Sequence, residues 1–185
     1  MQRKRVGILI VSCLVIGIAP LVKASVTFHS MQRQLDTLFS EGVNGDGLSI
    51  AAEITEKQSV VSNCITVAEQ RYRDQVDAAV LSQAYQAVEQ MTLAQTVQAI
   101  SQAEAQLDQA FAALIHQLES AALSAQDQRY VIGFQSDYAA AEDRISRDGY
   151  HQAAQKVQQE CSGPLAQLLM RLSIGSLEMY QGGEE

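Results

Sequence analysis

SQAEAQLDQAFAALIHQLES, residues Ser101–Ser120, shows the clearest helical periodicity in the sequence. Counted from the residue just before it, its main apolar side chains recur at steps of seven, four, three and four: Ile100, Leu107, Phe111, Leu114 and Leu118. Such a heptad seam is typical of a long helix packed in a bundle or coiled coil. Capping-box patterns at Thr92–Gln95 and Ser101–Glu104 are the two candidate starts of this helix.

Another apolar stripe predicts a helix before the seam. It is expected to run from Ile50 to about Glu89, with apolar side chains mostly three or four residues apart. The sequence EGVNGDGLS at 41–49 precedes it and holds three glycines, an Asn and an Asp, which is typical of a loop.

A further helix is predicted after the seam. The SAQD pattern at Ser124 suggests its N-cap, and the CSGP sequence at 161–164 is expected to end it. Its stripe consists of Val131, Phe134, Tyr138, Ala141 and Ile145. Beyond it, we expect a short apolar helix at 165–172 and a disordered tail at 177–185.

A segment suited to a membrane precedes these helices. Val6–Val22 holds seventeen residues without a charge. As a helix it would be about 26 Å long, close to the roughly 30 Å of a bilayer's hydrocarbon core. An apolar helical stripe follows with no turn signal between, at Phe28, Met31, Leu35 and Leu38. We therefore expect the segment to stay in the lipid bilayer and to continue into the domain.

Two other interpretations of this segment stay open. Ala24, with Val22 two residues before it, is an acceptable cleavage site that would release a secreted bundle. The sequence IVSC, which ends at Cys13, imitates a lipid-attachment box, but the apolar run continues nine residues past it. Retention as a membrane anchor is favoured over both.

The distribution of charge predicts the orientation. Arg3, Lys4 and Arg5 lie at one end of the segment and Lys23 alone at the other, so the positive-inside rule places the N-terminus in the cytoplasm. We expect a cytoplasmic stretch at 1–5, an anchor at 6–23 in the cytoplasmic (inner) membrane, and a bundle domain at 24–176 outside the cytoplasm.

The body of the chain is acidic. After Lys23 there remain 9 of the 13 basic residues against all 21 acidic ones, a net charge of −12. Phosphate backbones would repel such a surface, so nucleic acid is not expected as a partner. With only two prolines and abundant Ala and Gln, the composition is that of an all-α chain. We predict a transmembrane helix that continues into an antiparallel up-and-down bundle of about four long helices plus a short C-terminal helix.

The sequence offers no pattern that favours catalysis. The three histidines, His29, His116 and His151, include no HExxH motif, and the nearest approach to a di-iron motif is a single DGYH ending at His151. The adjacent carboxylates of Glu142 and Asp143 would point about 100° apart on a helix. We therefore expect no enzyme, no cofactor and no catalytic, cofactor-binding or metal-binding residue.

The two cysteines of the domain are not expected to pair. Cys64 falls in the middle of one predicted helix and Cys161 at the end of another, which separates them by about 30 Å along the bundle. A disulfide tolerates a Cα separation of only about 7 Å.

The seam and two later stretches resemble the LemA family. Ser101–Ser120 looks like that family's third-helix signature, Phe134–Ser146 is similar to its stretch around Glu142 and Arg144, and Gly163–Leu169 is similar to its proline-led tail. Of the family's most characteristic run, the segment SVVSNCI keeps only Asn63 and two apolar positions, as in a divergent member. The resemblance implies a membrane-anchored helical bundle and names no activity.

Two kinds of function fit these expectations. The first is docking or scaffolding of an unidentified envelope protein by an anchored bundle. The second is sensing of a small molecule by an extracytoplasmic bundle, as in the outer domain of a chemoreceptor.

Overall fold

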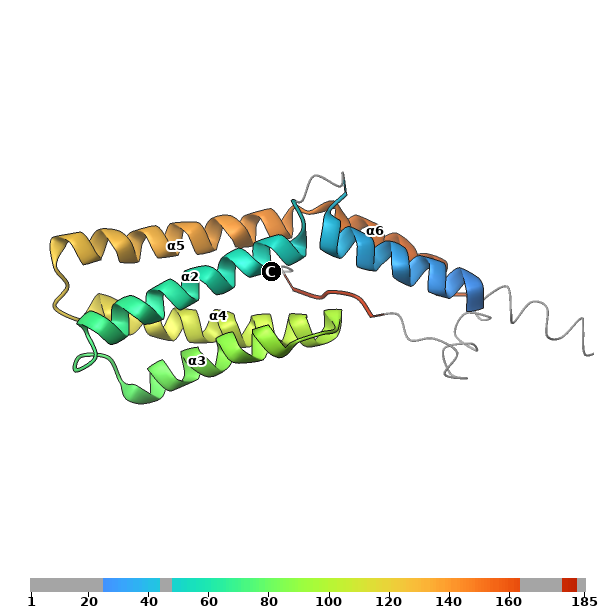
Figure 1. The fold of residues 1–185 in the computed structure, drawn as a ribbon. Coiled ribbons are helices and arrows are strands. Elements are labelled where there is room, and N and C mark those ends of the chain that lie inside the picture. The colour runs from blue at the N-terminus through green and yellow to red at the C-terminus, as the bar shows by residue number, and fades with distance from the viewer. Residues whose placement is uncertain (1–24, 44–47, 164–177, 183–185) are drawn as a thin grey trace, which may run out of the picture. The chain divides into compact units, whose positions relative to one another are not determined.

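The computed structural model describes residues 25–43, 48–163 and 178–182, and these ranges contain helices and no strand. The first helix covers residues 25–41. It is followed by α2 (Ile50–Arg71), α3 (Ala78–Leu93), α4 (Val97–Ser120), α5 (Ala125–Ser146) and α6 (Gly149–Glu160), as Figure 1 shows. The prediction of an all-helical bundle is confirmed at this level.

The chain forms two compact units. The helix-pair unit contains, among the described residues, 25–35 of the first helix and 152–163. The bundle unit contains 36–43, 48–151 and 178–182. Within the described residues, no helix combines the length and the apolar composition that a membrane span requires. The predicted anchor at 6–23 and the predicted helix at 165–172 lie outside the described residues.

Side-chain contacts define the directions of the helices in the bundle unit. Glu53, near the start of α2, pairs with Arg144 near the end of α5. Lys57 of α2 pairs with Glu104, which lies early in α4. α2 therefore runs antiparallel to α5 and parallel to α4. The side chain of Gln58, early in α2, donates to Thr92 near the end of α3, so α3 also runs antiparallel to α2. This is the expected up-and-down topology (Figure 1).

Each of these four helices begins at a capping side chain. Ser49, Asp77, Thr96 and Ser124 accept a hydrogen bond from a backbone N–H two or three residues further on. The N-cap predicted at Ser124 is confirmed. Neither candidate for the start of α4 is correct, because Ser101 lies inside the helix and the hydroxyl of Thr92 donates to the Val88 carbonyl.

The helix predicted from Ile50 to about Glu89 is in fact two helices. α2 ends at Arg71, and a turn leads to the new N-cap at Asp77. The apolar spacing continues through this turn because Tyr72 and Val76 are both buried in it. Periodicity alone therefore could not show the break.

The helix predicted from Ser124 to Cys161 is also divided. α5 ends at Ser146, and the carboxylate of Asp148 accepts a hydrogen bond from the backbone N–H of Tyr150 at 2.7 Å. A Cβ at Gly149 would lie only 2.7 Å from Cγ2 of Val43. Only glycine fits this close approach without moving its neighbour.

The apolar seam forms the centre of the core. Leu107, Leu114 and Leu118 of α4 are fully buried and Phe111 nearly so, while Ile100 in the first turns of the helix is half-buried. The ring of Phe111 stacks on Tyr138 of α5 at a centroid distance of 4.0 Å. The predicted register of this helix is confirmed.

The helix-pair unit packs residues 25–35 against the later part of α6. Phe28, Leu35, Val157 and Cys161 are buried, and Sγ of Cys161 lies 4.0 Å from Sδ of Met31. Cys64 and Cys161 are free thiols. Burial raises the pKa of the Cys64 thiol to about 12, so it stays protonated and unreactive near neutral pH.

Candidate functional site

A charged cluster lies inside the bundle unit, between α2 and α4. Nζ of Lys57 is 2.9 Å from Oε1 of Glu104 and 2.7 Å from Oδ1 of Asp108. Glu104 and Asp108 are four residues apart on α4 and so share one face of that helix. Lys57 is 1% exposed and Glu104 is 3% exposed, whereas Asp108 is partly open to solvent.

Two tyrosines complete this cluster. The hydroxyl of Tyr138 donates to Asp108 at 2.5 Å, and the hydroxyl of Tyr180 donates to Oε2 of Glu104. Nζ of Lys57 also lies over the Tyr138 ring, 4.8 Å from its centroid, in a cation–π contact. Among the described residues every buried side-chain nitrogen or oxygen has a hydrogen-bond partner.

The pairings within the cluster fix its protonation states. Burial lowers the pKa of Lys57, but the Glu104 and Asp108 carboxylates more than offset it, so the pKa lies above its usual value. A nucleophilic lysine needs the opposite shift. Burial, assisted by the same carboxylates, raises the pKa of Tyr138 and of Tyr180. The lysine is thus held as a cation and both phenols as neutral hydrogen-bond donors.

Residues 178–182 fall within the segment at 177–185 that is expected to form a disordered tail. The structure places these residues in the bundle unit, with Tyr180 only 3% exposed. The physical reason is the pairing of the Tyr180 hydroxyl with a carboxylate 76 positions earlier in the chain. The local composition of the tail carries no sign of that contact.

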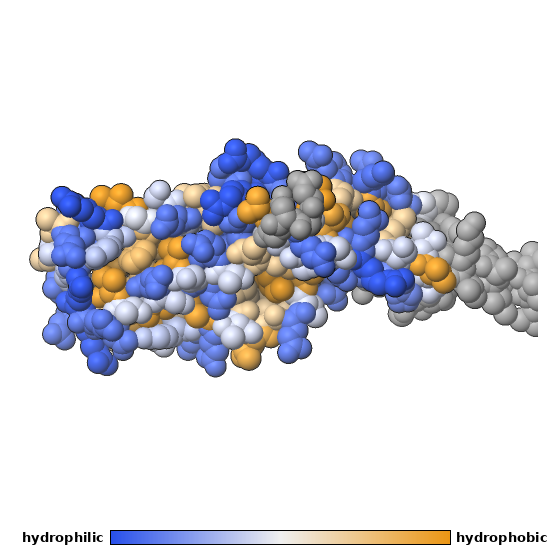
Figure 2. Space-filling model, turned by 45° about the horizontal axis from the view of Figure 1, so that its top comes forward, coloured by the Kyte–Doolittle hydropathy of each residue, from blue (hydrophilic) through white to orange (hydrophobic). Residues whose placement is uncertain are grey.

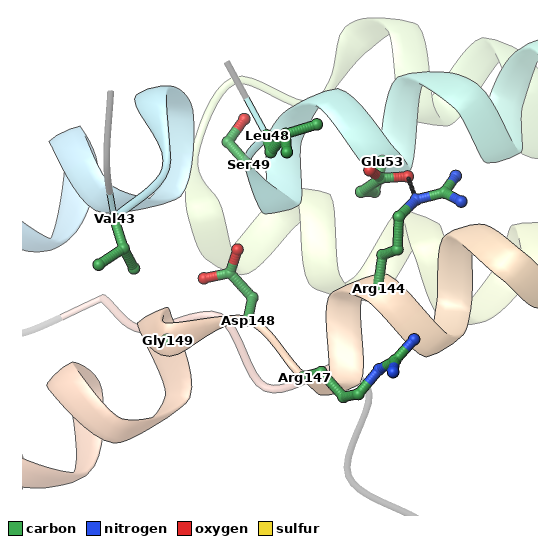
Figure 3. Close-up of a pocket in the computed structure, with 8 residues that line it drawn as sticks. All are labelled: Val43, Leu48, Ser49, Glu53, Arg144, Arg147, Asp148 and Gly149. Carbon is green, nitrogen blue, oxygen red and sulfur yellow. Dashed lines mark ion pairs between the residues drawn. The ribbon is translucent and has the colours of Figure 1, made fainter. Parts of the chain in front are cut away.

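An open pocket of about 290 Å³ lies elsewhere in the bundle unit. It is lined by Val43, Leu48, Ser49, Glu53, Arg144, Arg147, Asp148 and Gly149. Figure 3 shows Leu48 and Ser49 at the start of α2, and Arg144 and Arg147 at the end of α5. The pocket thus combines exposed apolar side chains with two guanidinium groups.

The ion pairs at this pocket are accessible to solvent. Nε of Arg144, which is about half exposed, lies 2.7 Å from Oε2 of Glu53 (Figure 3). Arg147 is 70% exposed and pairs with Asp143, one turn earlier on α5. Exposed pairs of this kind contribute roughly 0–1 kcal/mol, so Arg147 can exchange its partner at small cost.

A third polar cluster joins α2 to the start of α5. Asp127 is 4% exposed and accepts hydrogen bonds from Tyr72 at 2.6 Å and from the Ser124 hydroxyl at 2.7 Å, and it pairs with Arg71. These hydrogen bonds from Tyr72 and Ser124, with the charge of Arg71, lower the pKa of Asp127. The cluster therefore links the N-cap of α5 to the C-terminal end of α2.

The lowered pKa of Asp127 predicts an acid-dependent loss of stability. The contribution is present above the pKa of an unfolded aspartate, about 3.9, and is lost as the pH falls below it towards the lower folded pKa. Asp127→Asn should therefore lower the denaturation midpoint at pH 7, and the difference from the unsubstituted chain should shrink between pH 4 and 2. Urea unfolding followed by circular dichroism measures this. Asp137→Asn, at an exposed position of the same helix, is the control and should leave the profile unchanged.

One of the three histidines lies beside the charged cluster: the ring of His151 is 6.1 Å from that of Tyr180, measured between centroids. His29 and His116 are exposed, and half-buried His151 has Nε2 3.0 Å from the Ile145 carbonyl oxygen. No group of three His, Cys, Asp or Glu side chains in the described ranges could hold a metal ion.

The pairing of Lys57 with Glu104 was not predicted, although each residue occupies a position in the apolar stripe of its helix. The step of seven from Ile100 to Leu107 passes over Glu104, which occupies the missing seam position. Lys57 likewise falls in the apolar stripe, between Ile54 and Val61. A charged residue at a seam position signals a buried partner, because an unpaired buried charge is very costly.

Comparison with known proteins identifies no relative. No family model matches the chain, and no curated protein and no solved structure matches it.

Proposed function

We propose that this protein is a membrane-anchored, LemA-like helical bundle without enzymatic activity, which docks another protein of the cell envelope. The observation that carries the docking role is the pocket between the start of α2 and the end of α5. It presents Leu48, which is 65% exposed, and Val43, which is 53% exposed, beside Arg144 and Arg147.

The chemistry of this pocket suggests the kind of partner segment that would fit. Exposed apolar side chains lose water-accessible area on docking, which is favourable by about 25 cal/mol per Å². A carboxylate on the partner can take up Arg147, whose present pair with Asp143 is exposed and weak. The partner segment is thus expected to place an apolar side chain next to an Asp or Glu. Elsewhere, on the face drawn in Figure 2, hydrophobic residues form small groups separated by hydrophilic ones.

The membrane anchor is supported by the sequence. Val6–Val22 is uncharged and of a length suited to a bilayer, and the basic residues at 3–5 favour a cytoplasmic N-terminus. The bundle would then face the periplasmic or outer side, where envelope proteins are available as partners.

Site-specific crosslinking in intact cells tests the docking role. A photo-reactive amino acid at Leu48 should capture a protein, and the crosslinked peptide should contain an acidic residue. Arg147→Glu should abolish this crosslink without changing the melting temperature, because Arg147 is exposed. The matched control is the same probe at Leu93, which is 68% exposed on α3. Identical products from Leu48 and Leu93 would exclude the pocket as the docking surface.

Fractionation and reporter fusions test the anchor and its orientation. The full chain should sediment with membranes and need detergent for release, and a periplasmically active reporter after Glu185 should function. A soluble protein whose first residue is Ser25 would instead show that the segment is a cleaved signal. Activity of only a cytoplasmic reporter would reverse the orientation.

A further inference from the structure

The segment at 178–182 is bound through the side chain of Tyr180. This ring lies 5.6 Å from the ring of Phe39 and 6.3 Å from that of Tyr150, measured between centroids. Both neighbours are buried and belong, like Tyr180, to the bundle unit. Aromatic pairs at such distances attract one another through their ring quadrupoles.

Polar contacts fix the orientation of Tyr180 at both ends. Its hydroxyl donates to Oε2 of Glu104, and its backbone N–H donates to the Tyr150 hydroxyl at 2.9 Å. The fit is close: a Cβ at Gly182 would lie 2.2 Å from the Tyr180 hydroxyl oxygen and 2.7 Å from Oε2 of Glu104. Residue 182 must therefore be glycine for the phenol to reach its acceptor.

The side chains that contact Tyr180 are held in place by other contacts. Lys57 binds Oε1 of Glu104 and leaves Oε2 for the phenol. The rings of Phe39 and Tyr150 pack edge to face at 6.0 Å. The three side chains come from the first helix, α4 and the start of α6. Small-molecule sites are lined mostly by hydrophobic and aromatic side chains with a few fixed polar groups, and these three residues supply both kinds.

We propose that Phe39, Tyr150 and Glu104 form a recognition site for a para-substituted phenol, and that Tyr180 occupies this site as an intramolecular ligand. A buried carboxylate that must be paired selects a ring with a hydroxyl group over one without it. Because Tyr180 belongs to the same chain as the site, it competes intramolecularly, and a free phenol enters only when Tyr180 is removed or released.

Isothermal titration of the Tyr180→Gly chain with p-cresol and with toluene tests the proposal. We expect p-cresol to bind with one equivalent per chain, and toluene to bind at least about tenfold more weakly, because a hydrogen bond to a charged group is lost. The unsubstituted chain and Gln181→Ala, which changes an exposed neighbour and keeps Tyr180, should bind neither ligand at the same concentration. Equal affinity for both ligands, or binding of neither, would overturn the proposal.

A second measurement needs no cavity-forming substitution and tests the occupancy of the site by Tyr180 if the Tyr180→Gly chain does not fold. Hydrogen exchange in the unsubstituted chain should be at least tenfold slower at the Tyr180 backbone N–H than at that of exposed Gln181. Gly182→Ala should remove this difference, since the added methyl group displaces the phenol from Glu104. Equally fast exchange at the two amides of the unsubstituted chain would show that Tyr180 does not occupy the site.

Discussion

Lys57→Met is expected to destabilise the bundle unit by about 3–5 kcal/mol, because it leaves the buried carboxylate of Glu104 without its cation. The loss is a large part of the roughly 5–15 kcal/mol that holds a typical domain folded. Nζ of Lys57 lies 2.9 Å from Glu104 and 2.7 Å from Asp108. Because Glu104 is only 3% exposed, bulk water cannot hydrate its carboxylate in place of the lost ammonium group. Urea denaturation of the unsubstituted protein and of Lys57→Met at pH 7 measures the difference in the free energy of unfolding.

Two further variants test whether burial of the Lys57–Glu104 pair causes the loss of stability. Lys156→Met removes a lysine that is exposed on α6, and it should change the free energy of unfolding by no more than about 0.5 kcal/mol. In Lys57→Met/Glu104→Gln no uncompensated charge remains at position 104, so this double variant should be more stable than Lys57→Met alone. If Lys57→Met costs as little as Lys156→Met, the pair is not buried in solution.

Leu114→Asp is expected to unfold the bundle. Leu114 is fully buried in the second half of α4, so the substitution loses apolar packing and places an unpaired carboxylate in the core. The cost should be of the order of 3–5 kcal/mol or more. The far-ultraviolet circular dichroism of the variant at 25 °C should show loss of helix, or a melting temperature lowered by 10 °C or more.

The control for this prediction uses the same substitution at an exposed leucine. Leu93 ends α3 and is 68% exposed, so Leu93→Asp should melt close to the unsubstituted chain. An unchanged melting curve for Leu114→Asp would place that residue on the surface and contradict the register of α4.

Features that depend on neighbouring residues could be predicted from the sequence alone. Side chains three and four positions apart share one face of a helix, so the seam from Leu107 to Leu118 indicated both the existence of α4 and the face that it buries. The cap at Ser124 was likewise readable, because an N-cap bonds within three residues of itself.

The breaks in the two long predicted helices and the pairing of distant charges depend on tertiary packing and could not be predicted. The turn at 72–77 keeps the apolar spacing of α2, so its boundary depends on packing rather than on local pattern. Lys57 and Glu104 are 47 positions apart, and Glu104 and Tyr180 are 76 apart. Contacts between such distant residues arise from the register in which whole helices pack, and no local periodicity encodes that register.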